Sequence, residues 1–378
     1  MKKYIFTAIL VLYLFANVYV FLGYSSIVVE SSLAAKVLFT LIAVILTFSI
    51  LLFFAIGKRI PVYLASVLYK VGTGWFMLII QAFLLTVFFD LGRLVNGLFI
   101  HSNHWVFDSL SPQRGMLLIG GTLFIALLGH LNYLQKKRVE LNLTVDKELP
   151  NDLKIVVLTD MHMGYAIENK ELGSWVKLVN KEKADFILVA GDLIDVSLLP
   201  LQYYQLDNVL KQFESKYGTF ACVGNHEYLS GIERSIEFLK SAGITILRDS
   251  VAHFEDLNLA IIGRDDKTNL KRKKMSVLVE NIKENNVNIL LDHQPYQLEE
   301  AAENKIDLQF SGHTHRGQVW PISWITDRLF ENSYGYSKKD NTQYYVSSGI
   351  GIWGGRYRVG TKSEYVVVNL KGKNSKKK

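Results

Sequence analysis

The sequence has almost no cysteine, since Cys222 is the only one in 378 residues. A single cysteine excludes an intrachain disulfide, and its place in the apolar stretch 219–223 predicts a small core side chain rather than a redox centre. Charge is also absent from long stretches of the first 135 residues. An internal repeat of the kind that suggests a transporter is missing. The sequence also has no interleaved aromatic and basic residues of a recognised nucleic-acid-binding fold. We therefore expect no nucleic-acid partner.

Four stretches of the first 135 residues are apolar and long enough to cross a bilayer as helices, which takes about 20 residues. They cover residues 4–22, 37–56, 68–89 and 115–134. The first follows two lysines, as a signal peptide would, but its apolar run is longer than the core of a cleaved signal, so we expect a retained anchor. The sequence therefore predicts an all-α transmembrane region of four helices over residues 1–135.

Lysine and arginine beside these stretches predict the orientation of the chain, because positive residues in short loops stay on the cytoplasmic side. One side has Lys2, Lys3, Lys58, Arg59, Lys70, Lys136, Lys137 and Arg138, and the other has Lys36, Arg93 and Arg114. We therefore expect a multi-pass protein of the cell membrane, with both termini and the whole second half of the chain on the cytoplasmic side.

From residue 136 the pattern changes to short strands that alternate with amphipathic helices. Strands are expected at 139–145, 154–159, 185–190, 219–223, 260–263, 287–291, 307–310, 343–347 and 365–370, and helices at 169–182, 201–214 and 232–242. This alternation is typical of layered α/β folds. Because the last strands have fewer helices between them, we expect a second sheet and a four-layer α/β sandwich over residues 136–370. Residues 371–378 are expected to form a basic, disordered tail.

Five short polar motifs each interrupt or follow one of the expected strands. They are Asp160-Met161-His162, Gly191-Asp192-Leu193-Ile194-Asp195, Gly224-Asn225-His226-Glu227, Asp292-His293-Gln294-Pro295 and Gly312-His313-Thr314-His315. Each alone has an ordinary structural explanation, such as a helix cap at Asp192 or a turn at Asn225. Together they gather carboxylate, imidazole and amide groups at the carboxyl ends of strands, where open α/β sheets bind ligands. The set predicts a two-metal phosphoesterase site.

The chemistry of three residues suggests separate roles in such a site. Asp192 ends a very apolar strand, where an unpaired charge is costly to bury, and a carboxylate that bridges two cations would offset that cost. His226 is placed to supply or take a proton near a reacting phosphate, and Asp195 to orient the imidazole and raise its pKa. Mixed oxygen and nitrogen ligands suit Mn, Fe or Zn better than Ca.

On these motifs, residues 153–368 resemble the calcineurin-like metallophosphoesterase superfamily. The resemblance implies two divalent metal ions: one held by Asp160, His162, Asp192 and His315, and a second held by Asp192, Asn225, His293 and His313. It also implies that His226, supported by Asp195, acts on the phosphate or the leaving group without binding metal. In such a site the metal pair activates a hydroxide for in-line attack on phosphorus.

Gln318 and residues 347–351, followed by Arg358-Val359-Gly360, are similar to the bacterial membrane-anchored branch of that superfamily. That branch includes phosphodiesterases and UDP-diacylglucosamine pyrophosphatases. It implies hydrolysis of a phosphodiester or pyrophosphate bond in a phosphorylated, lipid-linked substrate at the cytoplasmic face. Two alternatives stay open: a tethered phosphatase or nucleotide phosphodiesterase that acts on soluble substrates, and a non-catalytic metal-binding membrane sensor.

Two residues depart from this branch without removing a ligand, because Arg316 replaces the usual glycine and Asp292 a small residue. Arg316 is either a phosphate contact or a solvated side chain. Trp320, in the apolar segment 319–330, either contacts an acyl chain or belongs to a packed loop. Arg358 completes the candidate substrate contacts. The bilayer itself is an expected partner, whereas the oligomeric state is not determined by the sequence.

Overall fold

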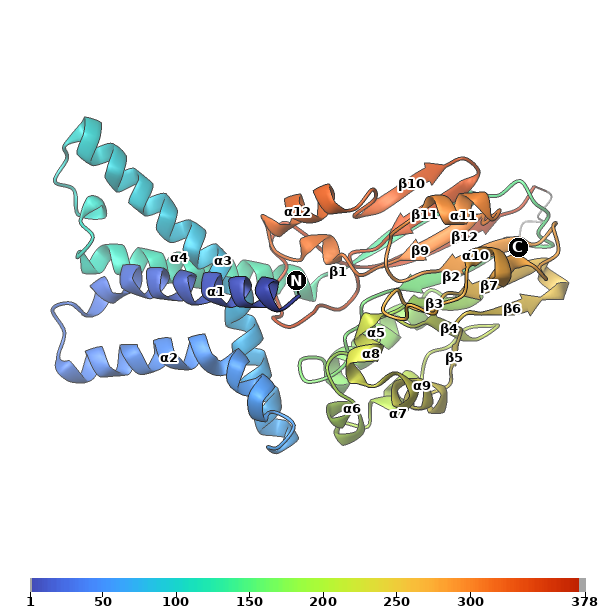
Figure 1. The fold of residues 1–378 in the computed structure, drawn as a ribbon, viewed down its shortest axis with the longest axis horizontal. Coiled ribbons are helices and arrows are strands. Elements are labelled where there is room, and N and C mark those ends of the chain that lie inside the picture. The colour runs from blue at the N-terminus through green and yellow to red at the C-terminus, as the bar shows by residue number, and fades with distance from the viewer. Residues whose placement is uncertain (1, 374–378) are drawn as a thin grey trace. The chain divides into compact units, whose positions relative to one another are not determined.

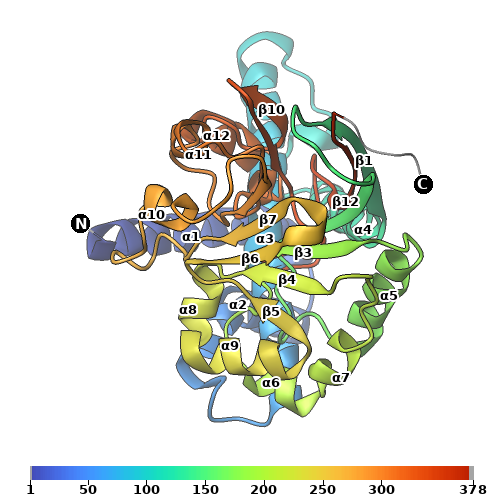
Figure 2. The same cartoon turned by 90° about the vertical axis from the view of Figure 1, so that its right-hand side faces the viewer.

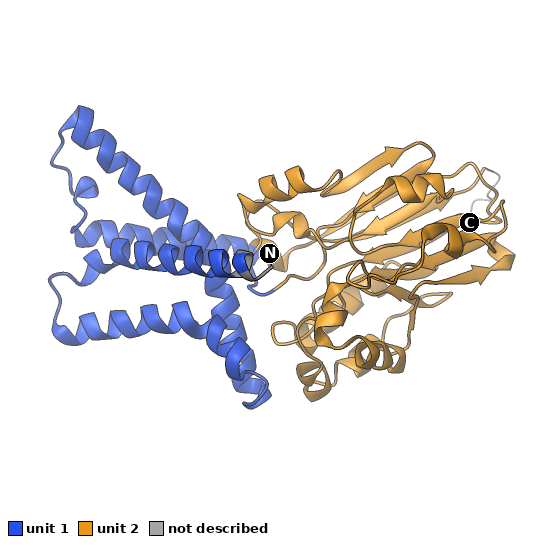
Figure 3. Ribbon diagram, in the orientation of Figure 1, with its two compact units in different colours: residues 1–131, 354–357 blue, residues 132–353, 358–378 orange. Residues whose placement is uncertain are grey.

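The structure is a computed structural model that describes residues 2–373 and divides into two compact units (Figure 3). Unit 1 comprises Met1–Leu131 and Gly354–Tyr357, and unit 2 comprises Asn132–Trp353 and Arg358–Lys378. The first boundary lies close to the predicted one after residue 135, but the membership of Gly354–Tyr357 in the helical unit was not predicted. The absence of a side chain at Gly355 allows this segment to approach α3 closely, since a Cβ atom there would lie only 2.8 Å from the carbonyl oxygen of Thr73.

Unit 1 is built from the helices α1 (Lys2–Tyr24), α2 (Leu33–Ile56), α3 (Val62–Val95) and α4 (Pro112–Leu134), and the last three residues of α4 already belong to unit 2. All four are long and apolar enough to cross a membrane, which confirms the predicted number of spans. Many large apolar side chains on them are exposed, as lipid-facing residues must be. At 34 residues, α3 is about 51 Å long and exceeds the hydrocarbon core of about 30 Å.

A buried polar network joins three of these helices around Asn17. The Asn17 Oδ1 atom accepts hydrogen bonds from Thr47 Oγ1 at 2.9 Å and from Trp75 Nε1 at 2.7 Å. The Asn17 amide nitrogen donates to the carbonyl of Tyr13, whose own hydroxyl donates to the carbonyl of Thr47. Because lipid offers no replacement partner, such bonds tie α1, α2 and α3 together.

Unit 2 contains two six-stranded sheets (Figures 1 and 2). In spatial order, the first sheet consists of β1 (Lys136–Thr144), β12 (Ser363–Lys371), β2 (Leu153–Leu158), β3 (Phe186–Ala190), β4 (Thr219–Cys222) and β5 (Ile244–Ile246). The second consists of β10 (Gly335–Lys339), β11 (Thr342–Val346), β9 (Leu308–Ser311), β8 (Val287–Leu291), β7 (Leu259–Gly263) and β6 (Ser250–Phe254). The central strands β2, β3 and β4 run parallel, as do β7, β8 and β9.

Alternate side chains of the central strands point to opposite faces and so serve two different cores. Ile155 and Val157 of β2 pack between the sheets with Ile289 and Leu291 of β8, in the core that also holds Cys222. On the outer face of the second sheet, Leu290 packs with residues of α10 (Met275–Val279) and α11 (Glu299–Glu303). The helices α5 (Asn169–Asn180), α7 (Leu206–Leu210) and α9 (Ile232–Ser241) cover the first sheet (Figure 2). The predicted four-layer α/β sandwich is confirmed.

The remaining differences from the sequence prediction are local. The helix expected over 201–214 is broken into α6 (Leu199–Tyr203) and α7, because Gln205 adopts a left-handed conformation with φ of 50°. The strands β5, β6 and β10 were not predicted. The prediction that a disordered tail begins at residue 371 is wrong at its first residue. Lys371 still belongs to β12, and its carbonyl accepts a hydrogen bond from the backbone N–H of Val145 at 2.9 Å. Residues 374–378 of that tail lie outside the described residues.

Replacing Asn17 by alanine removes the shared acceptor of Thr47 and Trp75. Interhelical hydrogen bonds in membranes average about 0.6 kcal/mol, so we expect the unfolding free energy of unit 1 to fall by about 1 kcal/mol. Titration of the full-length protein with sodium dodecyl sulfate measures this loss. Thr40→Ala is the control, because the Thr40 hydroxyl donates only within its own helix, to the carbonyl of Lys36. Equal stability of the two variants would contradict the role of Asn17.

Candidate metal centre

The predicted site residues follow the carboxyl ends of the central strands of both sheets. Asp160 and His162 follow β2, and Asp192 follows β3. Asn225 opens the short helix α8 (Asn225–Ser230) after β4. His293 follows β8, and His313 and His315 follow β9. Because β2, β3 and β4 are neighbours in one sheet, and β8 and β9 in the other, these loops meet at one end of the sandwich.

Several of these residues adopt a backbone conformation that is unfavourable for side chains with a Cβ atom. Asp160, His162, Asp192, His313 and His315 have φ values of 51°, 46°, 52°, 70° and 47°. Left-handed conformations are uncommon for residues other than glycine, and their clustering is characteristic of functional sites. The chain accepts this strain where it turns away from the strand ends and directs the polar side chains toward one another.

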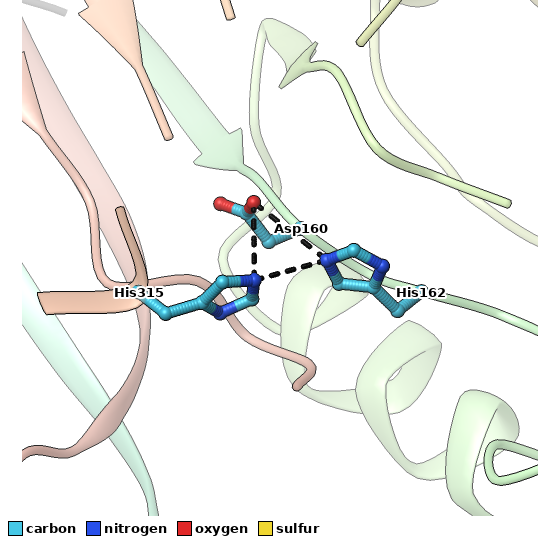
Figure 4. A group of neighbouring side chains, drawn as sticks. All are labelled: Asp160, His162 and His315. Carbon is cyan, nitrogen blue, oxygen red and sulfur yellow. Dashed lines mark hydrogen bonds and ion pairs between the residues drawn. The ribbon is translucent and has the colours of Figure 1, made fainter. Parts of the chain in front are cut away.

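The first group of possible ligands consists of Asp160, His162 and His315 (Figure 4). The Nε2 atoms of the two histidines lie 3.0 Å apart. Asp160 Oδ1 lies 3.5 Å from His315 Nε2 and 3.8 Å from His162 Nε2. Since all three side chains are nearly or fully buried, one cation between them would satisfy atoms that water cannot reach.

The second group consists of Asp192, His293 and His313. His293 Nδ1 lies 2.8 Å from the carbonyl oxygen of Ala190, which fixes this nitrogen as the donor and leaves Nε2 to face the site. That Nε2 atom is 3.0 Å from Asp192 Oδ2. The same carboxylate oxygen lies 3.8 Å from His162 Nε2 of the first group. Asp192 therefore lies between the two groups, as a bridging ligand would.

The donor set fits a pair of divalent cations. Asp160 and Asp192 are 0% and 2% exposed, and within residues 2–373 their ion-pair partners are histidines alone. The Asn225 side-chain oxygen is buried and finds no hydrogen-bond donor in the described part of the chain. Buried carboxylates without lysine or arginine partners, together with an orphaned amide oxygen, match ligands that require a metal ion.

His226 and Asp195 form a pair beside these groups. Asp195 Oδ1 lies 3.0 Å from His226 Nδ1 and 3.7 Å from His162 Nδ1. Burial alone would lower the pKa of His226, but the carboxylates of Asp192 and Asp195 outweigh it and raise that pKa to about 9. Burial raises the pKa of Asp195, whereas the neighbouring imidazoles of His162 and His226 prevail and lower it to about 2. Bound divalent cations would lower the pKa of His226 and so oppose the increase caused by the two carboxylates.

Glu227 has a role that the sequence analysis missed, although the residue is part of a quoted motif. Its carboxylate is fully buried and accepts hydrogen bonds from the backbone N–H groups of Gly224, Asp192 and Ile194, at 2.7, 3.1 and 2.9 Å. Burial, with the nearby charge of Asp192, raises its pKa to about 7. The glutamate thus joins the loop after β3 to the loop after β4. An acidic residue three positions after a helix cap was the available signal.

Glycines at the motifs leave the space that the carboxylates occupy. A Cβ atom on Gly224 would lie 2.1 Å from Asp192 Oδ1, and one on Gly312 would lie 2.2 Å from Asp160 Oδ2. Both distances are far below any van der Waals contact, so no other residue fits without displacing a ligand.

The three candidate substrate contacts lie in different environments. Arg316 is half-buried, with its guanidinium 4.6 Å from the centre of the Tyr334 ring. Trp320 is 38% exposed. Arg358 is buried and donates to main-chain carbonyls, that of His315 at 2.9 Å and those of Ser348 and Gly351 at 2.6 and 2.7 Å. This placement favours a role for Arg358 in positioning the His315 loop over direct contact with substrate.

The unusual Asp292 has local partners that explain it. Its carboxylate is 2% exposed, and its oxygens lie 3.3 Å from Arg264 Nη1 and 3.4 Å from Arg272 Nη1. Residues 271–274 are all lysine or arginine, and Arg272 among them forms an internal ion pair. The structure thus compensates the buried charge at position 292 with two guanidinium groups.

Gly224→Ala should weaken metal binding while the sandwich still folds, because the added methyl group occupies the position of the Asp192 carboxylate. Disturbing the support of a ligand typically costs about 10–100-fold in metal affinity, and we expect at least that. Metal content by mass spectrometry and thermal unfolding of the metal-free protein measure the two properties. Gly173→Ala is the control, since the nearest atom to its Cβ is 4.0 Å away. Unchanged metal affinity in Gly224→Ala would show that Asp192 is not a ligand.

Comparison with known proteins agrees with this geometry. The sequence profile of the calcineurin-like phosphoesterases matches residues 153–317. A metallophosphoesterase of Helicobacter pylori is 35% identical over 263 residues, which are 66% of this chain and 70% of the relative. One of Aquifex aeolicus is 32% identical over 266 residues, 67% of this chain and 100% of the relative.

A relative in a vertebrate also combines this domain with membrane segments. The protein of Danio rerio named transmembrane protein with metallophosphoesterase domain is 30% identical over 280 residues, 69% of this chain and 63% of the relative. The bacterial similarities extend over two thirds or more of those relatives. The chain therefore belongs to the calcineurin-like metallophosphoesterase family of hydrolases.

Proposed function

We propose that the protein is a membrane-anchored, two-metal phosphoesterase that cleaves a phosphodiester or pyrophosphate bond, with a lipid-linked substrate. The observation that carries the reaction class is the position of Asp192 between two groups of buried ligands, with His226 beside them. When bound, two divalent cations would polarise the phosphoryl oxygens and lower the pKa of a bound water molecule.

The residues of the chain have distinct tasks in this reaction. Asp195 holds His226 through Nδ1, so the other ring nitrogen is available to exchange a proton with the phosphate or the leaving oxygen. Glu227 and Arg358 hold the loops that carry Asp192 and His315. The left-handed backbone at the ligands keeps their side chains directed inward before substrate arrives, which lowers the cost of reorganisation during the reaction.

Support for a lipid-linked substrate comes from the membrane helices and from the exposed tryptophans that follow the last ligand. The alternative of a tethered enzyme for soluble phosphate esters shares the same metal centre. A metal-binding sensor is disfavoured, because binding alone would not need the His226–Asp195 pair.

Hydrolysis of a chromogenic phosphodiester and of the matching monoester by the full-length protein in detergent tests the reaction class. We expect Mn²⁺-dependent cleavage of the diester that a chelator abolishes. His226→Ala should lower turnover by about 100-fold or more with metal content unchanged, because general acid–base groups contribute at least that much. His253→Ala is the control, since this histidine is exposed on β6. Full turnover by His226→Ala would remove its proposed role, and preference for the monoester would favour the phosphatase alternative.

The cytoplasmic position of the metallophosphoesterase domain is a second proposal, supported by the distribution of lysine and arginine beside the spans. A reporter fused after residue 378 tests it. A fluorescent protein that matures only in the cytoplasm should be bright, and a phosphatase reporter that is active only outside should be silent. The opposite pattern would place the domain on the outer side of the membrane.

A further inference from the structure

An amphipathic helix with its apolar side outward follows the metal-binding loop of unit 2. The helix is α12 (Ile322–Leu329), and it begins seven positions after His315. Trp324, Ile325 and Leu329 are 65%, 56% and 69% exposed, whereas Ser323 is buried. Trp320, just before the helix, is 38% exposed and packs edge-on against Trp324, with ring centroids 5.3 Å apart. A soluble surface rarely presents large apolar side chains in one continuous patch.

The two ends of α12 lie close to the loop that carries His313 and His315. At its start, Gly317 allows the helix to pack closely, because a Cβ atom there would lie 2.4 Å from the backbone nitrogen of Ser323. At its end, the Phe330 ring lies 6.2 Å from the ring of His313. Any surface that covers the apolar side of α12 would therefore lie next to the candidate metal centre.

The exposed apolar side has the composition of a membrane–water interface. Tryptophan is enriched at that boundary, where amphipathic helices lie flat with their apolar side in the acyl region. Arg328 is exposed on the same helix and offers a positive charge to lipid phosphates. The acidic Asp327 is also exposed, and it accepts a hydrogen bond from the hydroxyl of Ser333. By contrast, helix α9 of the same unit exposes only polar side chains: Glu233, Arg234, Glu237, Lys240 and Ser241.

We propose that α12 is an interfacial helix that docks onto the lipid bilayer and holds the loop of His313 and His315 at the membrane surface. The occupant is the bilayer because the same chain carries four helices able to span one, so the domain is tethered where lipid is always near. This docking stands apart from the proposed function. Its consequence for catalysis, preferential attack on phosphate esters carried in the membrane, rests on that function.

Site-directed spin labelling of the full-length protein in vesicles of phosphatidylcholine and phosphatidylglycerol tests the docking. The chain suits this method because its sole cysteine, Cys222, is fully buried. A nitroxide on Ile325→Cys should be more accessible to oxygen, which partitions into lipid, than to a water-soluble nickel chelate. The matched label on Glu237→Cys, at an exposed position of α9, should show the reverse.

Any other pattern of oxygen and nickel accessibility for the label at position 325 would contradict the docking. Access to the nickel chelate equal to that of the Glu237→Cys label would place α12 in water. Low access to both reagents would mean that protein covers it, and dipolar broadening between labels would identify a second copy of the chain. The unsubstituted protein, treated with the same label, should give no nitroxide signal if Cys222 does not react.

A kinetic measurement separates docking from the proposed function. The substrates are p-nitrophenyl hexadecyl phosphate in the same vesicles and soluble p-nitrophenyl methyl phosphate. The double variant Trp324→Ser, Leu329→Ser should lose about tenfold or more in kcat/KM for the vesicle substrate, because two apolar anchors are removed, and keep its rate on the soluble one. Equal losses on both would contradict the catalytic consequence. No hydrolysis by the unsubstituted protein would instead contradict the proposed function, while the spin-label result still decides the docking.

Discussion

The candidate site depends on keeping the carboxylate of Asp192 charged where water cannot reach it. Burial raises the pKa of this group, but the surrounding imidazoles of His293, His226 and His162 outweigh burial and hold the pKa well below its usual range. The backbone supports the same residue, since its N–H donates to Glu227 and its Oδ1 accepts from the N–H of His226. So much polar support for one buried anion is costly to a fold unless cations join it.

The architecture explains how such support is possible. The first sheet supplies Asp160, His162 and Asp192, and the second supplies His293, His313 and His315, so the packed layer between the sheets sets the spacing of the ligands. A close-packed core has low compressibility, so it holds the strand ends and the ligand loops that follow them in fixed positions. Glycines at 224 and 312 then let backbone and carboxylate approach more closely than any side chain would allow. The precision of the site is thus a property of the sandwich as a whole.

The same physical rules of burial apply to the membrane segments and to the metallophosphoesterase domain, although the first face lipid and the second faces water. In unit 1, apolar side chains face outward and polar groups such as Asn17 are satisfied inside. In unit 2 most apolar side chains are buried, as in soluble proteins. Helix α12 is a local exception, because its apolar side faces outward beside the candidate metal ligands. That exception is consistent with a domain that works at a lipid surface rather than in bulk water.

The sequence by itself determined the four spans, most of the strands and the polar motifs, because each is written in a local pattern of hydrophobicity or in a few consecutive residues. The grouping of seven candidate ligands also followed from those motifs, through their resemblance to a family. Only the tertiary structure decided that Glu227 joins two ligand loops, that Arg358 is buried against carbonyls, that residues 354–357 belong to the helical unit and that α12 turns its apolar side outward. These features depend on hydrogen bonds and burial between residues far apart in the chain, and no local period records which distant group a side chain will meet.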